Sequence, residues 1–180
     1  MSPIEAIEAY IQAKDGNQPL LMKRAFADDA ELEMVVDTDA ISFPSTATGV
    51  EAITDILIRR FAIDFENVVT FCLSRPGPAN EKHFNCHWLV GMSAKTDGAI
   101  RVGCGRYGWH FNSGRVSKLV INIDLMNTFP ESDFDAIMNW LSGIPYPWCK
   151  SSDAHRGIPA LDGLAVIGAY LAAIDVEDRG

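Results

Sequence analysis

Apolar residues near the start of the chain recur with helical spacing, and a short segment with strand-like alternation follows. Ser2-Pro3-Ile4-Glu5 is a capping box with proline in the first helical turn, and it predicts a helix that ends at Gly16. Pro19 opens a second, short helix through residues 20–27. Residues 30–36 alternate, which predicts a strand whose apolar face includes Leu32, Met34 and Val36.

The residues on either side of this strand predict its boundaries. Asp28 and Asp29 favour a turn that ends the second helix and starts the strand. Residues 37–49 predict a loop. Thr48-Gly49-Val50-Glu51 then has the spacing of another capping box, and the positions after it predict a helix with one apolar face: Val50, Ile53, Ile56, Leu57 and Phe61.

From residue 67 the helical spacing gives way to four strand-like runs. They cover residues 67–74, 83–93, 99–112 and 115–126, and short turn-like segments separate them. Such short connections predict an antiparallel meander. The last fifty residues predict a short helix over 132–141, a Pro/Gly/Ser-rich linker over 142–159 and an alanine-rich helix over 160–174.

The composition narrows the function classes. The 180 residues fit one globular domain, and the net charge of −9 with scattered basic residues argues against nucleic-acid binding. The longest apolar run, 164–174, is too short to span a bilayer, so no membrane partner is expected. Without a secretory signal, the four widely spaced cysteines predict reduced thiols in a cytoplasmic protein; a Cys86–Cys104 pair is the alternative to core packing.

The predicted order is helix, helix, strand, helix and then four antiparallel strands. Together with the stretches FADDAELE (26–33) and GWHFNSGRV (108–116), this order resembles the nuclear transport factor 2-like superfamily, which has a cystatin-like α+β barrel fold. The resemblance covers residues 3–128. It implies a strongly bent antiparallel sheet around helices with a conical pocket, and residues 129–180 would form a C-terminal helical extension packed on the same domain.

A conical pocket requires one apolar side on each strand, and the alternation supplies it. His87 falls on the opposite side, so it would need a one-residue bulge to point inward. Aromatic rings are also ordinary in a barrel core, so a filled core is the alternative to a ligand site. The predicted ligand-pocket residues are Met34, Phe84, Trp88, Trp109, Leu119, Ile121 and Ile123.

The ketosteroid isomerases of this superfamily hold a developing oxyanion between a helix tyrosine and an acidic residue on the penultimate strand. The resemblance places Tyr10 at the tyrosine position and Tyr107 at the acid position, where a phenol can also donate a hydrogen bond. Met34 falls at the position of the aspartate base. Because methionine takes no proton, Asp37 in the following loop is the candidate base, with a solvated loop acid as the alternative.

We therefore expect a SnoaL-like protein that binds a small apolar or planar carbonyl compound, with Tyr10, Tyr107 and Asp37 as candidate catalytic residues for an isomerase, cyclase or dehydratase. The alternative is a non-catalytic binding or dimerisation module with a filled cavity. The spacing of His and Cys predicts no metal site, and no cofactor is expected. The alanine-rich C-terminal helix suggests a homodimer or core packing, with a lid over the pocket as the other possibility.

Overall fold

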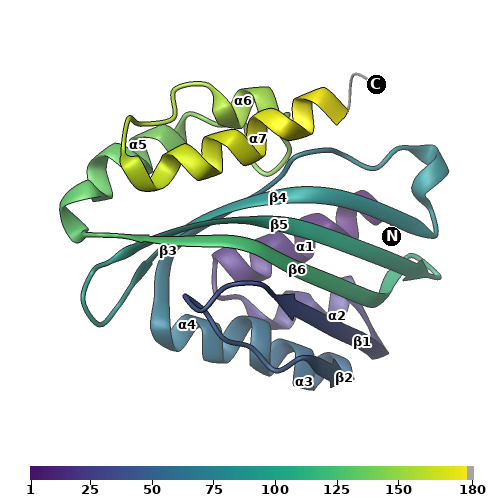
Figure 1. The fold of residues 1–180 in the computed structure, drawn as a ribbon. Coiled ribbons are helices and arrows are strands. Elements are labelled where there is room, and N and C mark those ends of the chain that lie inside the picture. The colour runs from purple at the N-terminus through teal and green to yellow at the C-terminus, as the bar shows by residue number, and fades with distance from the viewer. Residues whose placement is uncertain (178–180) are drawn as a thin grey trace.

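The computed structural model describes residues 1–177. The chain forms three layers, with one curved, open sheet between two groups of helices (Figure 1). The strand order is β2-β1-β6-β5-β4-β3. β1 runs parallel to β6, while the other neighbouring strands pair antiparallel. The expected α+β fold is confirmed, and the parallel β1–β6 pair is a feature that the sequence pattern did not reveal.

The strands alternate with helices only in the first half of the chain. The strands are β1 Phe26–Val36, β2 Thr46–Thr48, β3 Phe65–Cys72, β4 His83–Ala94, β5 Ile100–Asn112 and β6 Arg115–Phe129. The helices on the first face are α1 Pro3–Asp15, α2 Met22–Ala25, α3 Val50–Thr54 and α4 Phe61–Asp64, and a π-helical stretch, Asp55–Arg60, joins α3 to α4. The helices on the other face are α5 Phe134–Ser142, α6 Ser151–His155 and α7 Ala165–Glu177.

Two local signals work as predicted. At the start of α1, the Glu5 backbone N–H donates to Ser2 Oγ at 3.3 Å, and the Ser2 N–H donates to the Glu5 carboxylate at 2.8 Å. Between β5 and β6, Ser113 and Gly114 both have positive φ, at 51° and 80°. Those angles match the tight two-residue turn that follows the twist of a hairpin, and the turn pairs Asn112 with Arg115. Farther along, the β5–β6 register shifts between His110 and Phe111 and between Cys104 and Gly105.

Two other local predictions are wrong. Asp28 and Asp29 form no turn, because β1 already begins at Phe26. They lie in the irregular stretch of β1 between Phe26 and Glu31, where the pairing with β6 shifts its register. Thr48 caps no helix either, because it belongs to β2; Gly49, with φ of 90°, is the cap residue and donates its N–H to Ala30 O. At Thr48, strand pairing with Glu31 takes the place of the helix cap.

The sheet has an apolar side toward each helical layer. The core under α1, α3 and α4 contains every second residue of two strands: the even-numbered residues from Phe84 to Met92 of β4 and the odd-numbered residues from Tyr107 to Phe111 of β5. Leu89, Val102 and Cys104 belong to a second core under the C-terminal helices. His87 points to that second side, where its ring meets the Tyr170 ring of α7 at 5.8 Å, so no bulge turns it inward. All four cysteines are buried and free.

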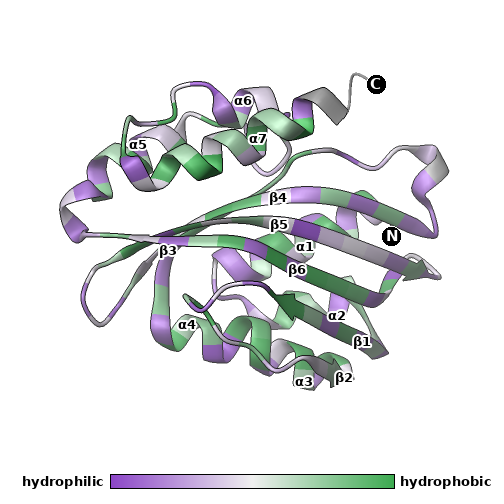
Figure 2. Cartoon of the chain, viewed as in Figure 1, coloured by the Kyte–Doolittle hydropathy of each residue, from purple (hydrophilic) through white to green (hydrophobic). Residues whose placement is uncertain are grey.

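The C-terminal helices cover the face of the sheet opposite to α1 (Figure 1). α7 begins at Ala165 rather than 160, after a turn of 3₁₀ helix, and α6 lies inside the predicted linker. α7 is mostly hydrophobic (Figure 2), and its predicted stripe is buried: Leu164, Ile167, Leu171 and Ile174. α7 therefore packs on the core and does not cap a pocket on the other face. In the described part of the chain, no helix has the length and apolar character to cross a membrane.

Candidate functional site

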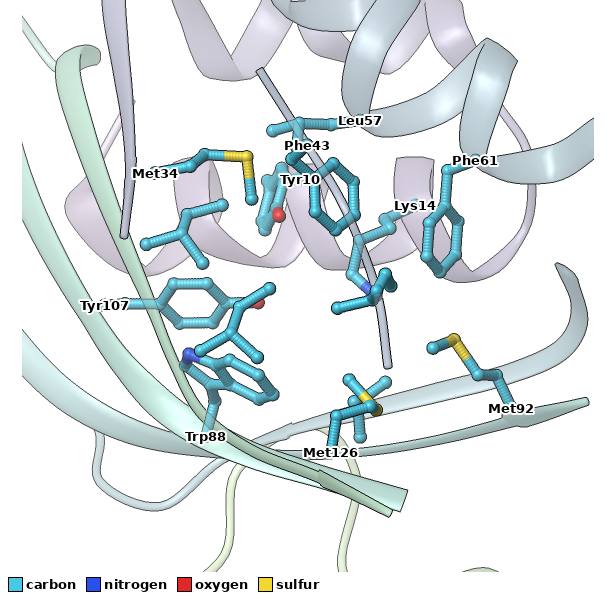
Figure 3. A pocket seen from close by; sticks show the side chains of 14 residues that line it. Tyr10, Lys14, Met34, Phe43, Leu57, Phe61, Trp88, Met92, Tyr107 and Met126 are labelled. Carbon is cyan, nitrogen blue, oxygen red and sulfur yellow. The ribbon is translucent and has the colours of Figure 1, made fainter. Parts of the chain in front are cut away.

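A small cavity lies between the concave face of the sheet and the first group of helices (Figure 3). Its volume is about 50 Å³, which is room for a few water-sized groups. Most of its wall is apolar, and the polar groups in the wall come from two tyrosines, a lysine and the indole of a tryptophan. The lining residues are Tyr10, Lys14, Met34, Ile41, Phe43, Leu57, Phe61, Trp88, Val90, Met92, Tyr107, Ile121, Ile123 and Met126.

The structure brings the two candidate oxyanion tyrosines together. Tyr10 of α1 and Tyr107 of β5 have ring centroids 6.1 Å apart and nearly perpendicular planes. Burial raises the pKa of both phenols above the usual value. Both hydroxyls therefore stay protonated at physiological pH, as a hydrogen-bond donor to a ligand oxygen must.

The third polar group of the cavity is one that the sequence reasoning missed. Lys14 lies one helical turn after Tyr10 on α1, and its side chain is 9% exposed. Its Nζ donates to Thr70 Oγ1 at 2.7 Å and lies 5.1 Å from the centre of the Phe61 ring. Burial lowers the pKa of Lys14, against the opposing effect of Asp15. The four-residue spacing from Tyr10 was the signal that could have found it, because such residues share one helix face.

Asp15 is the counter-ion of Lys14, and its carboxylate also accepts hydrogen bonds from Thr70 and Tyr146. Its Oδ1 lies 3.4 Å from Lys14 Nζ and accepts the Thr70 hydroxyl at 2.8 Å. Its Oδ2 accepts the Thr70 N–H at 2.7 Å and the Tyr146 hydroxyl at 3.0 Å. Tyr146 belongs to the segment after α5, which returns to the edge of β3 through the backbone bonds of Cys72. The C-terminal extension thus helps to hold the charged pair beside the cavity.

Six of the predicted site residues line the cavity: Tyr10, Met34, Trp88, Tyr107, Ile121 and Ile123. Phe84, Trp109 and Leu119 are buried in the same core but lie outside the lining. Trp109 packs against both tyrosines, with its ring centroid 5.4 Å from that of Tyr10 and 5.2 Å from that of Tyr107.

The candidate base Asp37 directly follows β1. Its backbone N–H donates to the carbonyl of Ile123, a cavity residue, at 3.0 Å. The Asp37 side chain is exposed and is not part of the cavity wall. Contact between this carboxylate and a bound molecule would therefore require movement of the loop that it begins.

A hollow on the surface of the protein adjoins the cavity. Ile41, Phe43 and Phe61 line both the cavity and a surface hollow of about 510 Å³. The Phe43 and Phe61 rings stack with centroids 6.5 Å apart, so they form a partition between the two spaces. Arg60 and Arg101 lie on the outer side of this partition. A loop residue and a helix residue thus separate the cavity from the surface hollow.

Trp88 lines the cavity with its ring, and its indole N–H is an unsatisfied buried donor. Trp88 is 3% exposed, and its Nε1 has no hydrogen-bond partner among the described residues. A buried donor without a partner costs about 1–3 kcal/mol. Residues 1–177 contain no cluster of three or more His, Cys, Asp or Glu that could hold a metal ion.

Comparison with known proteins rests on structure. Neither protein-family models nor curated proteins match the chain. A hypothetical protein from Catenulispora acidiphila with a ketosteroid isomerase-like fold, solved in complex with trimethylamine, has a TM-score of 0.53 and 20% identity over 67% of this chain and 85% of its own. An NTF2-like protein from Burkholderia xenovorans has a TM-score of 0.51 and 11% identity over 68% and 88%.

The chain has the nuclear transport factor 2-like fold. A hexachlorocyclohexane dehydrochlorinase, LinA type 2, shares this nuclear transport factor 2-like fold with a TM-score of 0.55 and 14% identity over 69% of this chain and 84% of its own. The expectation drawn from the FADDAELE and GWHFNSGRV stretches is thus confirmed for the fold. Identities this low carry no residue roles from one chain to the other, so the site has to be judged on its own chemistry.

Proposed function

We propose that the protein binds a small carbonyl compound in the cavity, with the carbonyl oxygen held by the hydroxyls of Tyr10 and Tyr107. The observation that carries this proposal is the meeting of two protonated phenols in an otherwise apolar wall. Such a wall excludes water and strengthens the hydrogen bonds that a ligand oxygen would accept. The related fold in complex with trimethylamine is consistent with a small ligand.

The size of the cavity sets a condition on the ligand. Ligand sites usually measure about 300–1,000 Å³, whereas this cavity has about 50 Å³. Three methionines line it, Met34, Met92 and Met126, and their unbranched side chains can rearrange at low cost. A planar ligand would therefore occupy the space by displacing thioether groups and by opening the contact between Phe43 and Phe61.

Thermal denaturation with a size-graded panel of ketones and their matching alcohols tests the proposal. A ligand present at 100 times its Kd stabilises the folded state by about 2.7 kcal/mol, which corresponds to roughly 5–11 °C in Tm. Tyr10→Phe and Tyr107→Phe should each weaken binding roughly 2- to 12-fold, the loss expected for one hydrogen bond. Tyr170→Phe is the matched control, because that hydroxyl donates to Asp124 on the other face of the sheet.

If binding serves catalysis, the arrangement supports proton transfer next to the carbonyl, as in an isomerase, cyclase or dehydratase. Tyr10 and Tyr107 would stabilise the oxyanion, and Asp37 is the proposed proton acceptor. Asp37→Asn separates the roles: turnover should fall while ligand affinity stays the same. Turnover that survives this substitution would remove Asp37 from the mechanism.

The small cavity favours a second candidate function, a non-catalytic binding or dimerisation module whose core fills most of the space. In that case no ketone of the panel stabilises the protein, and Tyr10→Phe changes only the stability of the fold. A homodimer and a cytoplasmic location remain predictions, and sedimentation equilibrium tests the first of them. Because the apolar stripe of α7 is buried within the chain, a dimer would have to use another surface.

A further inference from the structure

Lys14 differs from every other lysine of the chain in its surroundings. Its side chain is 9% exposed and lines the cavity, whereas the remaining five lysines are exposed or, in one case, half-buried at the surface: Lys23, Lys82, Lys95, Lys118 and Lys150. A lysine is rarely buried unless it is paired or has a chemical role. The pairing with Asp15 explains how Lys14 is tolerated, but it does not require the nitrogen to face the cavity.

The Lys14 side chain points into the space that the two phenols also face (Figure 3). Figure 3 shows the Lys14 nitrogen and the hydroxyl oxygens of Tyr10 and Tyr107 directed toward the same space. A carbonyl group in that space would present its oxygen to the phenols and its carbon to the amine. This is the arrangement in which an amine adds to a carbonyl, because the developing negative charge on oxygen has donors beside it.

We propose that Lys14 forms an imine with the carbonyl carbon of an aldehyde or ketone held in the cavity. The inference rests on the proposed carbonyl-binding function and makes that binding covalent and reversible. It assigns to Lys14 the role of nucleophile, which amine side chains perform when they are desolvated in an apolar site.

The reaction balances within the site. The lone pair of neutral Nζ forms a C–N bond, and the electron pair of the C=O double bond moves to oxygen, which takes a proton from a phenol of Tyr10 or Tyr107. That phenol regains a proton from the attacking nitrogen. The carbinolamine then loses its oxygen as water while the N=C bond forms. Both hydrogens of the water come originally from the amine, so no oxidant, reductant or other reactant is needed.

The groups around Lys14 raise the fraction of the neutral amine that this chemistry needs. Desolvation lowers the pKa of Lys14, while Asp15 and Cys72 act in the opposite direction without cancelling it. Each unit of lowering raises the fraction of free amine about tenfold at a pH below the pKa. Burial keeps Tyr10 and Tyr107 protonated, so the amine is the group that loses its proton first.

Reductive trapping on the wild-type protein tests the inference. The protein is incubated at neutral pH with propanal, benzaldehyde or butanone and cyanoborohydride, and each lysine is then quantified by peptide mass spectrometry. The exposed lysines are internal controls. Lys14 should be alkylated several-fold faster than Lys23 or Lys150, and its excess should shrink as the pH approaches 10.5, where exposed amines lose their protons. Alkylation that simply follows exposure, with Lys14 the least modified, would overturn the inference.

Variants keep the inference separate from the proposed function. Lys14→Met should abolish trapping in the cavity, whereas Lys118→Met should leave it unchanged. If ketones raise Tm in the wild type but no adduct forms at Lys14, the imine is refuted and noncovalent carbonyl binding stands. If no carbonyl compound raises Tm and none is trapped at Lys14, the proposed function fails together with the inference.

Discussion

The pair Lys14–Asp15 leads to a quantitative prediction about stability. Asp15→Asn keeps the shape of the side chain and one acceptor oxygen but removes the negative charge 3.4 Å from Lys14 Nζ. Lys14 then has no counter-ion in its protonated form, and the donors of Thr70 and Tyr146 lose a charged acceptor. Breaking one partner of a buried pair costs about 3–5 kcal/mol, so Tm should fall by roughly 6–20 °C.

Urea denaturation at pH 7 measures the change, with Glu33→Gln as the matched control. Glu33 pairs with Lys118 at 3.0 Å, but these side chains are 45% and 36% exposed. Loss of such a surface pair costs under about 1 kcal/mol. The double variant Lys14→Met/Asp15→Asn should recover much of the loss, because it removes the unpaired charge. A cost for Asp15→Asn no larger than that for Glu33→Gln would refute the reasoning.

Three further predictions follow from other contacts. Gly105→Ala should lower the free energy of unfolding in urea by about 1–3 kcal/mol, because the new Cβ would meet the Asn122 carbonyl and come within 2.5 Å of the Trp88 ring. Gly108→Ala is the control and should be near neutral, because its Cβ would come no closer than 3.4 Å to any neighbouring atom. Trp140→Phe should cost about 1–3 kcal/mol by leaving the buried Ala154 carbonyl without its 2.9 Å donor, and an unchanged urea midpoint would contradict this. The pKa of Lys14 is lowered on folding, so the unfolded chain binds more protons than the folded chain below pH 10.5. The stability of the wild type relative to Lys14→Met should therefore rise from pH 7 toward pH 10. A difference in stability that does not change with pH would exclude the lowered pKa.

The sequence pattern was most informative where a feature depends on neighbours along the chain. The capping box at Ser2 and the tight turn at Ser113 and Gly114 involve residues within a few positions, and both form as expected. The alternation in β4 and β5 also identified the inward side chains, because the two-residue period of a strand needs no knowledge of its partners. The order of elements that these local rules predict, together with the resemblance carried by residues 26–33 and 108–116, was sufficient to predict the α+β fold.

The tertiary structure decided the features that depend on distant residues. Thr48 became part of β2 because it pairs with Glu31 of β1, and Asp28 became part of β1, a strand that pairs with β6. Both pairings bring together residues far apart in sequence. Lys14 became a cavity residue because Asp15 and Thr70, 55 positions apart, together solvate its charge. The sequence by itself thus determined which residues face inward. Only the folded chain decided which of them meet, because burial and pairing energies arise from contacts that local spacing does not contain.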